Sequence, residues 1–440
     1  MNPLIARAKN DVDQAELYWS RKRELTVRYE NYRLQTITEN DLSSVALRVI
    51  AEGRLGTTFG VTPDQDGLLE SARAAASYGD PAPFSFAPAA EYPSVNAYDA
   101  ATAELSSDDL VALCERIKTR IAAARPDIAL IIHAEAKTSQ LTVQTTEGAD
   151  GESTSTTLRV GFAAPIKGAG IGISKSAGSI SPFDVEDELI DEFLEWYAWT
   201  EATSTPATGR LPVILAPEAG FLLLLPLIAG LDGTALDRKT SPLVGKIGER
   251  ILSEKLTVVD DAVRSGHVNA RAFDDEGVPC RRRVLIDAGV LNGVLLDRRT
   301  GAALGEASTG NGRKKAMFGE GTEMAPNPWP VNPTVEPGDV PIRDLIADLD
   351  EGLLLINGMG FHSGNFPQGH FSVQAVGFHI RDGKVVGRLD KTMVAGNVYE
   401  DLLHVRAVSR EQRGTHALSL LASGMSSPYI LIDGLQVAGG

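Results

Sequence analysis

The chain has 440 residues, of which 43% are apolar and 23% charged, the composition of a folded globular protein long enough for two or three domains. Its formal net charge of −16 repels phosphate groups and disfavours nucleic acid as a partner. The longest apolar run, residues 221–231, is about half as long as a membrane-spanning helix. We therefore expect this run to form a buried helix, and we expect no membrane partner.

Cysteine usage and the first residues of the chain indicate the compartment. Cys114 and Cys280 are isolated in the sequence and do not make the framework of a disulfide-rich secreted protein. Residues 1–14 become charged too early for a secretory signal. We therefore expect a cytoplasmic protein.

The first section of the chain, residues 1–85, begins with a short amphipathic segment that strand-like stretches follow. Apolar and polar residues alternate in three separate stretches, at residues 24–30, 32–38 and 44–52. The last of these and residues 56–62 predict a hairpin around Gly53 and Arg54. Apolar residues three and four positions apart then predict a helix near residues 65–78.

A linker with four prolines, residues 79–93, leads from the first section, residues 1–85, to the second, residues 106–205. The second section opens with a helix that Ser106 or Ser107 can cap, because serine side chains accept hydrogen bonds from the free N–H groups of a first turn. Several strands and a second helix near residues 185–200 follow.

The two sections predict a mixed α/β N-terminal domain of residues 1–205, and residues 206–440 predict a β-rich C-terminal domain. The second domain combines short apolar strands with the apolar helix after Glu218 and a hairpin turned at residues 382–383. Residues 310–341 are too rich in glycine and proline for regular structure, and a loop of this length is usually functional or mobile. The expected fold class is α+β.

Several separated segments of the chain, in this order, resemble the TldD/TldE (PmbA) family. These segments are residues 216–261, 273–305, 326–339 and 385–408. In the catalytic members, called TldD, the apolar helix has an HExxxH zinc-binding pattern, and a cysteine near the C-terminus resembles a third ligand. This spacing matters because zinc hydrolysis requires two histidines on one helix face with a general base close by.

The corresponding positions in this chain have lost all zinc-binding groups. Counting back from Arg238, the three positions of the pattern fall on Leu225, Pro226 and Gly230, and no cysteine follows Arg410. The resemblance to the non-catalytic TldE/PmbA members therefore implies no catalytic residue, metal or cofactor site in this chain. It implies a heterodimer with a TldD-like catalytic subunit, which would hold zinc and cleave unfolded or short peptides, while this chain shapes the chamber.

Basic and aromatic residues in the long loop are candidates for contacts with a substrate or a partner. Arg313, Lys314 and Lys315 could guide an acidic peptide or meet the partner subunit, although exposed basic residues need no special role. Trp329 could anchor the partner, because aromatic side chains are enriched at interface centres, or it could fill its own loop.

Two histidines leave further functions open. His362 and His370 flank a glycine-rich segment, where they could form the acid–base or metal pair of a divergent hydrolase, or lie as polar residues on a turn. A third alternative is a homodimeric peptide-binding protein that has no protease partner.

Overall fold

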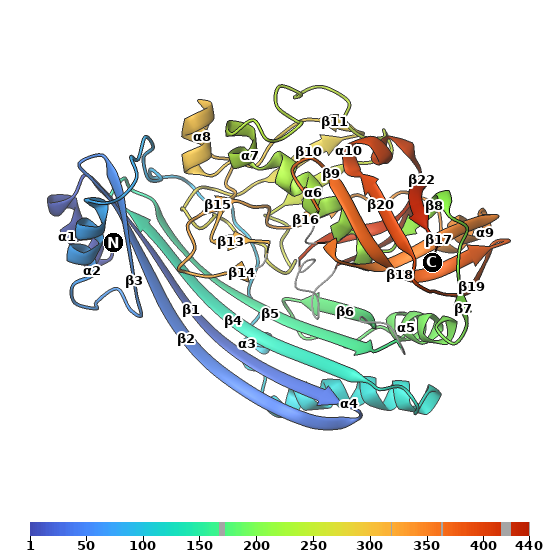
Figure 1. The fold of residues 1–440 in the computed structure, drawn as a ribbon. Coiled ribbons are helices and arrows are strands. Elements are labelled where there is room, and N and C mark those ends of the chain that lie inside the picture. The colour runs from blue at the N-terminus through green and yellow to red at the C-terminus, as the bar shows by residue number, and fades with distance from the viewer. Residues whose placement is uncertain (167–171, 318, 362–363, 415–423, 440) are drawn as a thin grey trace.

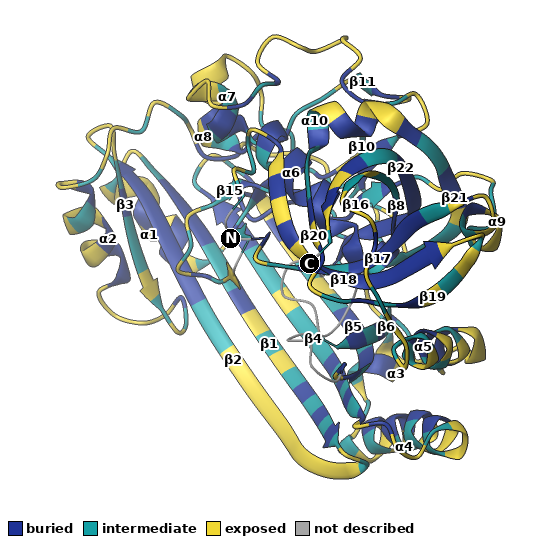
Figure 2. Ribbon diagram, turned by 45° about the vertical axis from the view of Figure 1, so that its right-hand side comes forward, coloured by how far each residue is buried: buried dark blue, intermediate teal, exposed yellow. Residues whose placement is uncertain are grey.

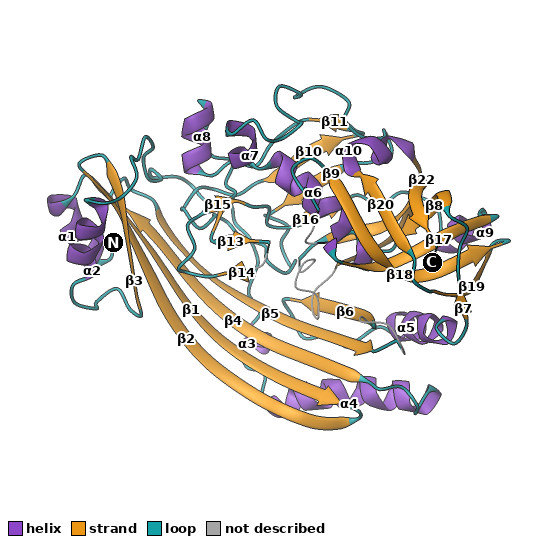
Figure 3. Ribbon diagram, in the orientation of Figure 1, coloured by secondary structure: helices purple, strands orange, loops and turns teal. Residues whose placement is uncertain are grey.

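Two β-sheets organise the protein in the computed structural model (Figure 1). The structure describes residues 1–166, 172–317, 319–361, 364–414 and 424–439. Within these ranges, one sheet has six strands, the other has twelve, and helices pack against both. This combination confirms the predicted α+β class (Figure 3).

The N-terminal sheet is antiparallel and strongly curved (Figure 1). In spatial order its strands are β3 (Arg54–Gly60), β2 (Arg33–Ala51), β1 (Gln14–Glu30), β4 (Ile131–Thr145), β5 (Asp150–Ala164) and β6 (Ile173–Ser179). The pairing of β2 with β3 confirms the hairpin predicted around Gly53. The prediction of separate strands at residues 32–38 and 44–52 is wrong, because β2 continues through the polar residues between them.

Helices cover the convex face of this sheet at its two ends (Figure 1). α1 (Pro3–Asp11) and α2 (Leu68–Ala76) pack at one end against buried residues that include Leu17 and Leu47. α4 (Ser107–Ala124) packs at the other end. Ser106 caps α4, as predicted, because its side chain accepts a hydrogen bond from the Asp109 backbone and the Asp109 side chain accepts one from the Ser106 backbone.

α5 (Asp187–Trp199), the second predicted helix, connects the two sheets. The ring of Phe193 lies 5.1 Å from that of Phe162 in β5, and the ring of Trp196 lies 6.1 Å from that of Phe378 in β18 (His370–Arg381). One buried apolar cluster therefore contains residues of both sheets. The N-terminal sheet ends at Ser179 and the second sheet begins at Thr203. The domain boundary at residues 205–206 stays a prediction.

The C-terminal sheet is mixed and folds around one apolar helix. Its other strands are β7 (Thr203–Ser204), β8 (Gly209–Leu215), β9 (Val258–Asp261), β10 (Arg282–Asp287), β11 (Val290–Leu291), β16 (Pro333–Val335), β17 (Glu351–Met359), β19 (Lys384–Leu389), β20 (Met393–Asn397), β21 (Val405–Gly414) and β22 (Ser426–Ala438). Alternate residues of β8 point to opposite faces, so Val213 and Leu215 contact the cluster around the helix, whereas Ile214 belongs to the cluster of α5.

That apolar helix is α6 (Phe221–Leu231), and it follows a 3-10 turn at Pro217–Ala219. Ten of its eleven residues are buried, which confirms the predicted buried helix. None of the helices within the described ranges is long and apolar enough to cross a membrane.

The long loop of residues 310–341 lies over the concave face of the N-terminal sheet (Figure 1). Apart from residue 318, which lies outside the described ranges, its strands have two or three residues each; besides β16 they are β12 (Gly312–Arg313), β13 (Lys315–Ala316), β14 (Gly319–Glu320) and β15 (Asn327–Pro328). The hydroxyl groups of Thr322 in the loop and Ser44 in β2 are 2.6 Å apart. The loop is therefore fixed to the sheet rather than extended into solvent.

Candidate functional site

The three positions that correspond to the zinc pattern lie inside the core on α6. Leu225, Pro226 and Gly230 are all buried. Their helix packs against apolar side chains of β8, β17 and β22. Proline within a helix removes one backbone hydrogen bond and costs about 3 kcal/mol, so α6 depends on this packing for its stability.

The side chain of Tyr399 occupies the space next to Gly230. Tyr399 belongs to α10 (Val398–Asp401), and its hydroxyl donates a hydrogen bond of 3.4 Å to the carbonyl oxygen of Pro226. A Cβ atom at Gly230 would lie 1.8 Å from the Tyr399 hydroxyl oxygen, far inside contact distance. Burial raises the pKa of Tyr399 well above its usual value, so the phenol stays protonated near neutral pH.

This arrangement does not fit the zinc ion that the family resemblance implies for a catalytic member. Leucine, proline and glycine offer no nitrogen, oxygen or sulfur side-chain donor, and a histidine at position 230 would collide with Tyr399. In the part of the chain that the structure describes, no group of three His, Cys, Asp or Glu side chains is placed to hold a metal ion.

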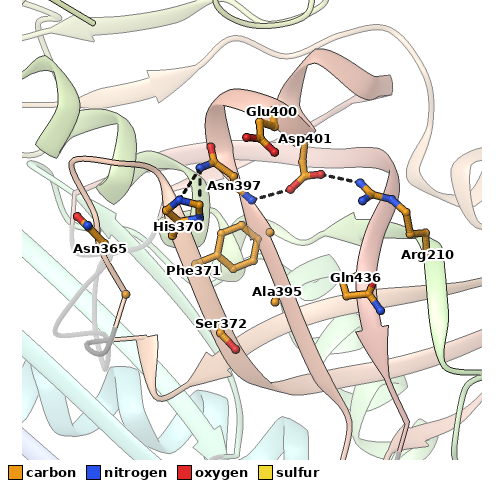
Figure 4. A pocket seen from close by; sticks show the side chains of 12 residues that line it. Arg210, Asn365, His370, Phe371, Ser372, Ala395, Asn397, Glu400, Asp401 and Gln436 are labelled. Carbon is orange, nitrogen blue, oxygen red and sulfur yellow. Dashed lines mark hydrogen bonds and ion pairs between the residues drawn. The ribbon is translucent and has the colours of Figure 1, made fainter. Parts of the chain in front are cut away.

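An open pocket of about 480 Å³ lies on the other side of α10 (Figure 4). Its lining residues are Arg210, Gly364, Asn365, His370, Phe371, Ser372, Ala395, Gly396, Asn397, Glu400, Asp401 and Gln436. Strand register explains the floor, because Ser372, Ala395, Gln436 and Arg210 are direct neighbours in one row across β18, β20, β22 and β8. The small side chains of Ser372 and Ala395 keep this floor low.

Charged residues form one wall of the pocket. Arg210 and Asp401 form an ion pair of 3.0 Å, and the second carboxylate oxygen of Asp401 accepts a hydrogen bond of 2.6 Å from the Asn397 backbone (Figure 4). Asp401 is buried, whereas Arg210 and Glu400 are exposed. Because Arg210 compensates only one carboxylate, this wall favours a polar ligand that carries a positive charge or hydrogen-bond donors.

Asn397 connects the pocket to α6. Its amide nitrogen lies 3.3 Å from both ring nitrogens of His370 and donates a hydrogen bond to the carbonyl oxygen of Gln368. Its amide oxygen accepts a hydrogen bond of 2.9 Å from the backbone of Tyr399, which caps α10. Contacts therefore run without interruption from His370 through Asn397 and Tyr399 to Pro226.

The other predicted contact residues lie elsewhere. Arg313 is mostly buried and pairs with Asp275 at 3.2 Å. Lys314 is 3% exposed and donates hydrogen bonds to two backbone carbonyl oxygens of its own loop, and burial lowers its pKa to about 8. Lys315 lies 4.0 Å from Glu320. Contacts of these residues with a partner stay predictions, and the burial of Lys314 weighs against its share in them.

Trp329 and the two histidines have different outcomes. Trp329 is half-buried and packs against the core cluster around α6, which agrees with the alternative that it fills its own loop. His362 lies outside the described residues, so the predicted pairing of His362 with His370 stays a prediction. Asn397 and Tyr399, which connect the pocket with α6, were not among the predicted residues; the sequence signal was the Asn-Val-Tyr-Glu-Asp run at an expected helix start.

Comparison with known proteins identifies the family. Residues 208–439 match the family model described as the PmbA/TldA metallopeptidase C-terminal domain, and residues 15–78 match PmbA/TldA metallopeptidase domain 1. The crystal structure of TldE from Thermococcus kodakarensis is 25% identical in sequence, superposes with a TM-score of 0.89 and covers 99% of both chains.

Several curated relatives are named metalloproteases. One from Methanothermobacter thermautotrophicus is 30% identical over 256 residues, which are 56% of this chain and 54% of that protein. A metalloprotease TldD homolog from Buchnera aphidicola (strain APS) is 26% identical over 244 residues, 53% of this chain and 49% of that protein. The chain thus spans about half the length of these relatives. Since one family model matches more than half of the chain, the chain belongs to the TldD/TldE (PmbA) family.

Proposed function

We propose that this chain is the non-catalytic subunit of a cytoplasmic, two-chain zinc metalloprotease that cleaves unfolded or short peptides. The observation that supports this proposal most strongly is the chemistry of α6. Leu225 and Pro226 provide no metal ligand or general base, and Tyr399 fills the space in which a side chain at position 230 would stand. Zinc would belong to the TldD-like partner, and this chain would provide part of the chamber.

The concave face of the N-terminal sheet is suited to form a chamber wall. Polar side chains of neighbouring strands lie there as ion pairs, with Lys137 of β4 at 3.4 Å from Glu24 of β1 and Lys22 at 4.0 Å from Glu320 of the long loop. These side chains are 18–49% exposed, so they are accessible to a ligand. Side chains of both charges can pair with hydrogen-bond donors and acceptors of peptides that differ in sequence.

The test is to purify the chain alone and together with a TldD-type chain encoded in the same genome. Zinc content is measured by atomic emission, and cleavage is followed on an unfolded peptide. We expect neither bound zinc nor cleavage from the lone chain, and one zinc per pair with cleavage from the mixture. One zinc per lone chain, with cleavage that a chelator stops, would contradict the proposal.

The pocket at His370 favours one competing function, in which the lone chain is a divergent hydrolase. His370 is exposed in a polar pocket and is contacted by Asn397. If this function holds, the lone chain cleaves peptides and His370→Ala abolishes that cleavage. If the heterodimer proposal holds, the lone chain is inactive and the variant still assembles with the partner. Sedimentation of the lone chain also separates both from the homodimeric peptide-binding alternative.

A further inference from the structure

The outer half of β2 is an open edge of the N-terminal sheet. β3 pairs with β2 only along residues 45–51, whereas residues 33–42 pair with β1 alone. No further strand continues the sheet beyond these residues in the described part of the chain. All ten residues from 33 to 42 are exposed, and Figure 2 shows them as one continuous exposed segment at the edge of the sheet.

This edge lacks several of the features that usually prevent one sheet from joining another, although it carries charged residues and a bulge near its start. Soluble proteins protect long edges with proline, lysine or a covering loop, because the free backbone N–H and C=O groups otherwise recruit another strand. Residues 33–42 contain no proline, glycine or lysine. Three of them are large and apolar, and Leu34, Ile37 and Leu42 are 45%, 47% and 53% exposed. Such an edge is suited to strand addition.

The regular part of the edge is residues 36–42. The pairing of β1 with β2 shifts in register at Gln35, because Arg28 lies opposite Thr36 and Tyr29 lies opposite Leu34. A bulge of this kind interrupts a strand edge. The remaining seven residues span about 23 Å, the length of an ordinary strand.

The charges of this segment indicate what can pair with it. The side chains at alternate positions, Ile37, Glu39 and Asp41, lie on the same face of the strand. Glu39 forms an exposed ion pair with Arg23 of β1 at 2.8 Å, whereas Asp41, which lies directly opposite Arg23 in the strand register, forms no ion pair among the described residues. An added strand would therefore place an apolar residue near Ile37 and a lysine or arginine opposite Asp41.

A second copy of this chain is a poor occupant. Two identical edges that pair antiparallel with full overlap would be centred on Glu39 and would place that carboxylate opposite itself. A centre at Asn40 places Glu39 opposite Asp41, and a centre at Thr38 leaves the two Glu39 side chains as diagonal neighbours. Like charges in cross-strand positions are destabilising, and the net charge of −16 adds to this repulsion.

We propose that residues 36–42 of β2 bind an extended strand of the metal-bearing partner subunit, with a basic residue opposite Asp41, so that the N-terminal sheet continues across the heterodimer. This inference rests on the proposed function and adds to it the surface and the chemistry by which the two chains meet. The charges that favour a basic strand also select against pairing of the chain with itself.

Amide hydrogen exchange tests this inference on the full chain, alone and mixed with the TldD-type chain of the same genome. In the lone chain, the outward-facing amides among residues 36–42 should exchange fast, whereas amides of β4, which is paired on both sides, serve as the slow reference. In the mixture we expect the outward-facing amides to slow by at least about tenfold.

The possible outcomes separate this inference from the proposed function. If the pair assembles and cleaves peptide but these amides keep their fast exchange, the edge is not the docking surface, although the proposed function stands. If no pair assembles, both are overturned. If the amides of the lone chain become protected as its concentration rises, the occupant is a second copy and the inference is wrong.

Charge reversal provides a second test with a matched control. Asp41→Lys should raise the Kd of the heterodimer at least tenfold, because it places a lysine opposite the basic residue of the partner. Glu70→Lys makes the same charge change on α2 at the far end of the sheet, where Glu70 is 69% exposed, and should leave Kd unchanged. Both side chains are exposed, so both variants should fold. Asp41→Lys places a lysine opposite Arg23 of β1, so the unfolding temperatures of both variants are measured beside Kd to show that the weaker pair does not come from unfolding. Equal Kd values for the two variants would overturn the inference.

Discussion

At the scale of single residues, Gly230 and Tyr399 fit one another too closely for any larger side chain at position 230. A Cβ atom there would stand 1.8 Å from the Tyr399 hydroxyl oxygen and 3.1 Å from the ring carbon that bears it. We expect Gly230→Ala to lower the free energy of unfolding by about 1–3 kcal/mol, as overpacking of a core does. Urea denaturation measures this change.

A second pair of variants measures the effect of the Tyr399 hydroxyl group separately. Tyr399→Phe removes the colliding oxygen, so Gly230→Ala should cost less in the Tyr399→Phe background than in the wild type. Gly293→Ala is a control, because the nearest atom to its added Cβ lies 3.8 Å away. Additive effects of the two substitutions would show that Tyr399 does not limit the space at position 230.

Arg48 is a second residue whose local contacts affect stability, because it pairs with two buried carboxylates. Its guanidinium contacts Glu16 at 2.6 Å and Glu276 at 3.0 Å, and all three side chains are buried. Burial raises the pKa of Glu276 to about 8, although the guanidinium opposes this shift. The pKa of a glutamate in the unfolded chain is about 4.3. At pH values between these two pKa values the folded state binds more protons than the unfolded state, so the free energy of unfolding falls as the pH rises.

Glu276→Gln should remove this contribution to the pH dependence. We expect the loss of unfolding free energy between pH 5 and pH 8 to shrink by on the order of 2 kcal/mol relative to the wild type. Denaturant unfolding at the two pH values measures it, and Glu70→Gln, at an exposed position, should behave as the wild type does. An unchanged pH dependence in Glu276→Gln would mean that Glu276 is ionised throughout this range.

At the scale of elements, α4 shows how far a helix start can be predicted. The sequence leaves Ser106 and Ser107 as alternative caps, and the structure selects Ser106, which forms a capping box with Asp109. Ser106→Ala should therefore lower stability by about 1 kcal/mol, whereas Ser107→Ala should have little effect. Thermal unfolding of both variants is the measurement, and equal losses would contradict the assigned cap.

Other elements were predictable where apolar runs or turn residues mark them in the sequence. The helix after Glu218 and the hairpin at residues 382–383 follow from apolar runs and turn residues, and both are present as α6 and the β18–β19 pair. The middle of β2 was missed because residues 39–42 are exposed on both faces, so no alternation of apolar and polar side chains marks them as a strand. Backbone pairing with β1 and the ion pair of Glu39 with Arg23 hold this segment.

The part of the candidate site that lies on α6 could be predicted from the sequence, whereas the contacts of α6 with α10 and the pocket could not. The loss of zinc-binding groups at Leu225 and Gly230 can be read from the sequence. The hydrogen bond of Tyr399 joins residues 173 positions apart, and such a contact depends on the packing of α10 against α6. The pocket floor likewise depends on the register of four strands, which no local pattern determines.

At the scale of the whole molecule, a buried charge cluster joins the two sheets in addition to the apolar cluster around α5. Lys175 of β6 is fully buried between Glu192 of α5 at 3.0 Å and Glu218 of the 3-10 turn before α6 at 2.9 Å. Tyr429 of β22 also donates a hydrogen bond to Glu192. The cluster therefore connects the N-terminal sheet directly to the segment that positions α6.

Removal of the central charge should loosen this connection. Lys175→Met leaves Glu218 buried without a cation and leaves Glu192 paired with Arg413 alone, so we expect a loss of about 3–5 kcal/mol in the free energy of unfolding. Adding Glu218→Gln removes the carboxylate that has lost its cation and should recover part of this loss, whereas independent sites would give additive losses. Urea denaturation followed by tryptophan fluorescence reports the transition, because the Lys175 ammonium nitrogen lies 3.2 Å from the ring centroid of Trp196. A Lys175→Met variant as stable as the wild type would mean that apolar packing of α5 alone holds the two sheets together.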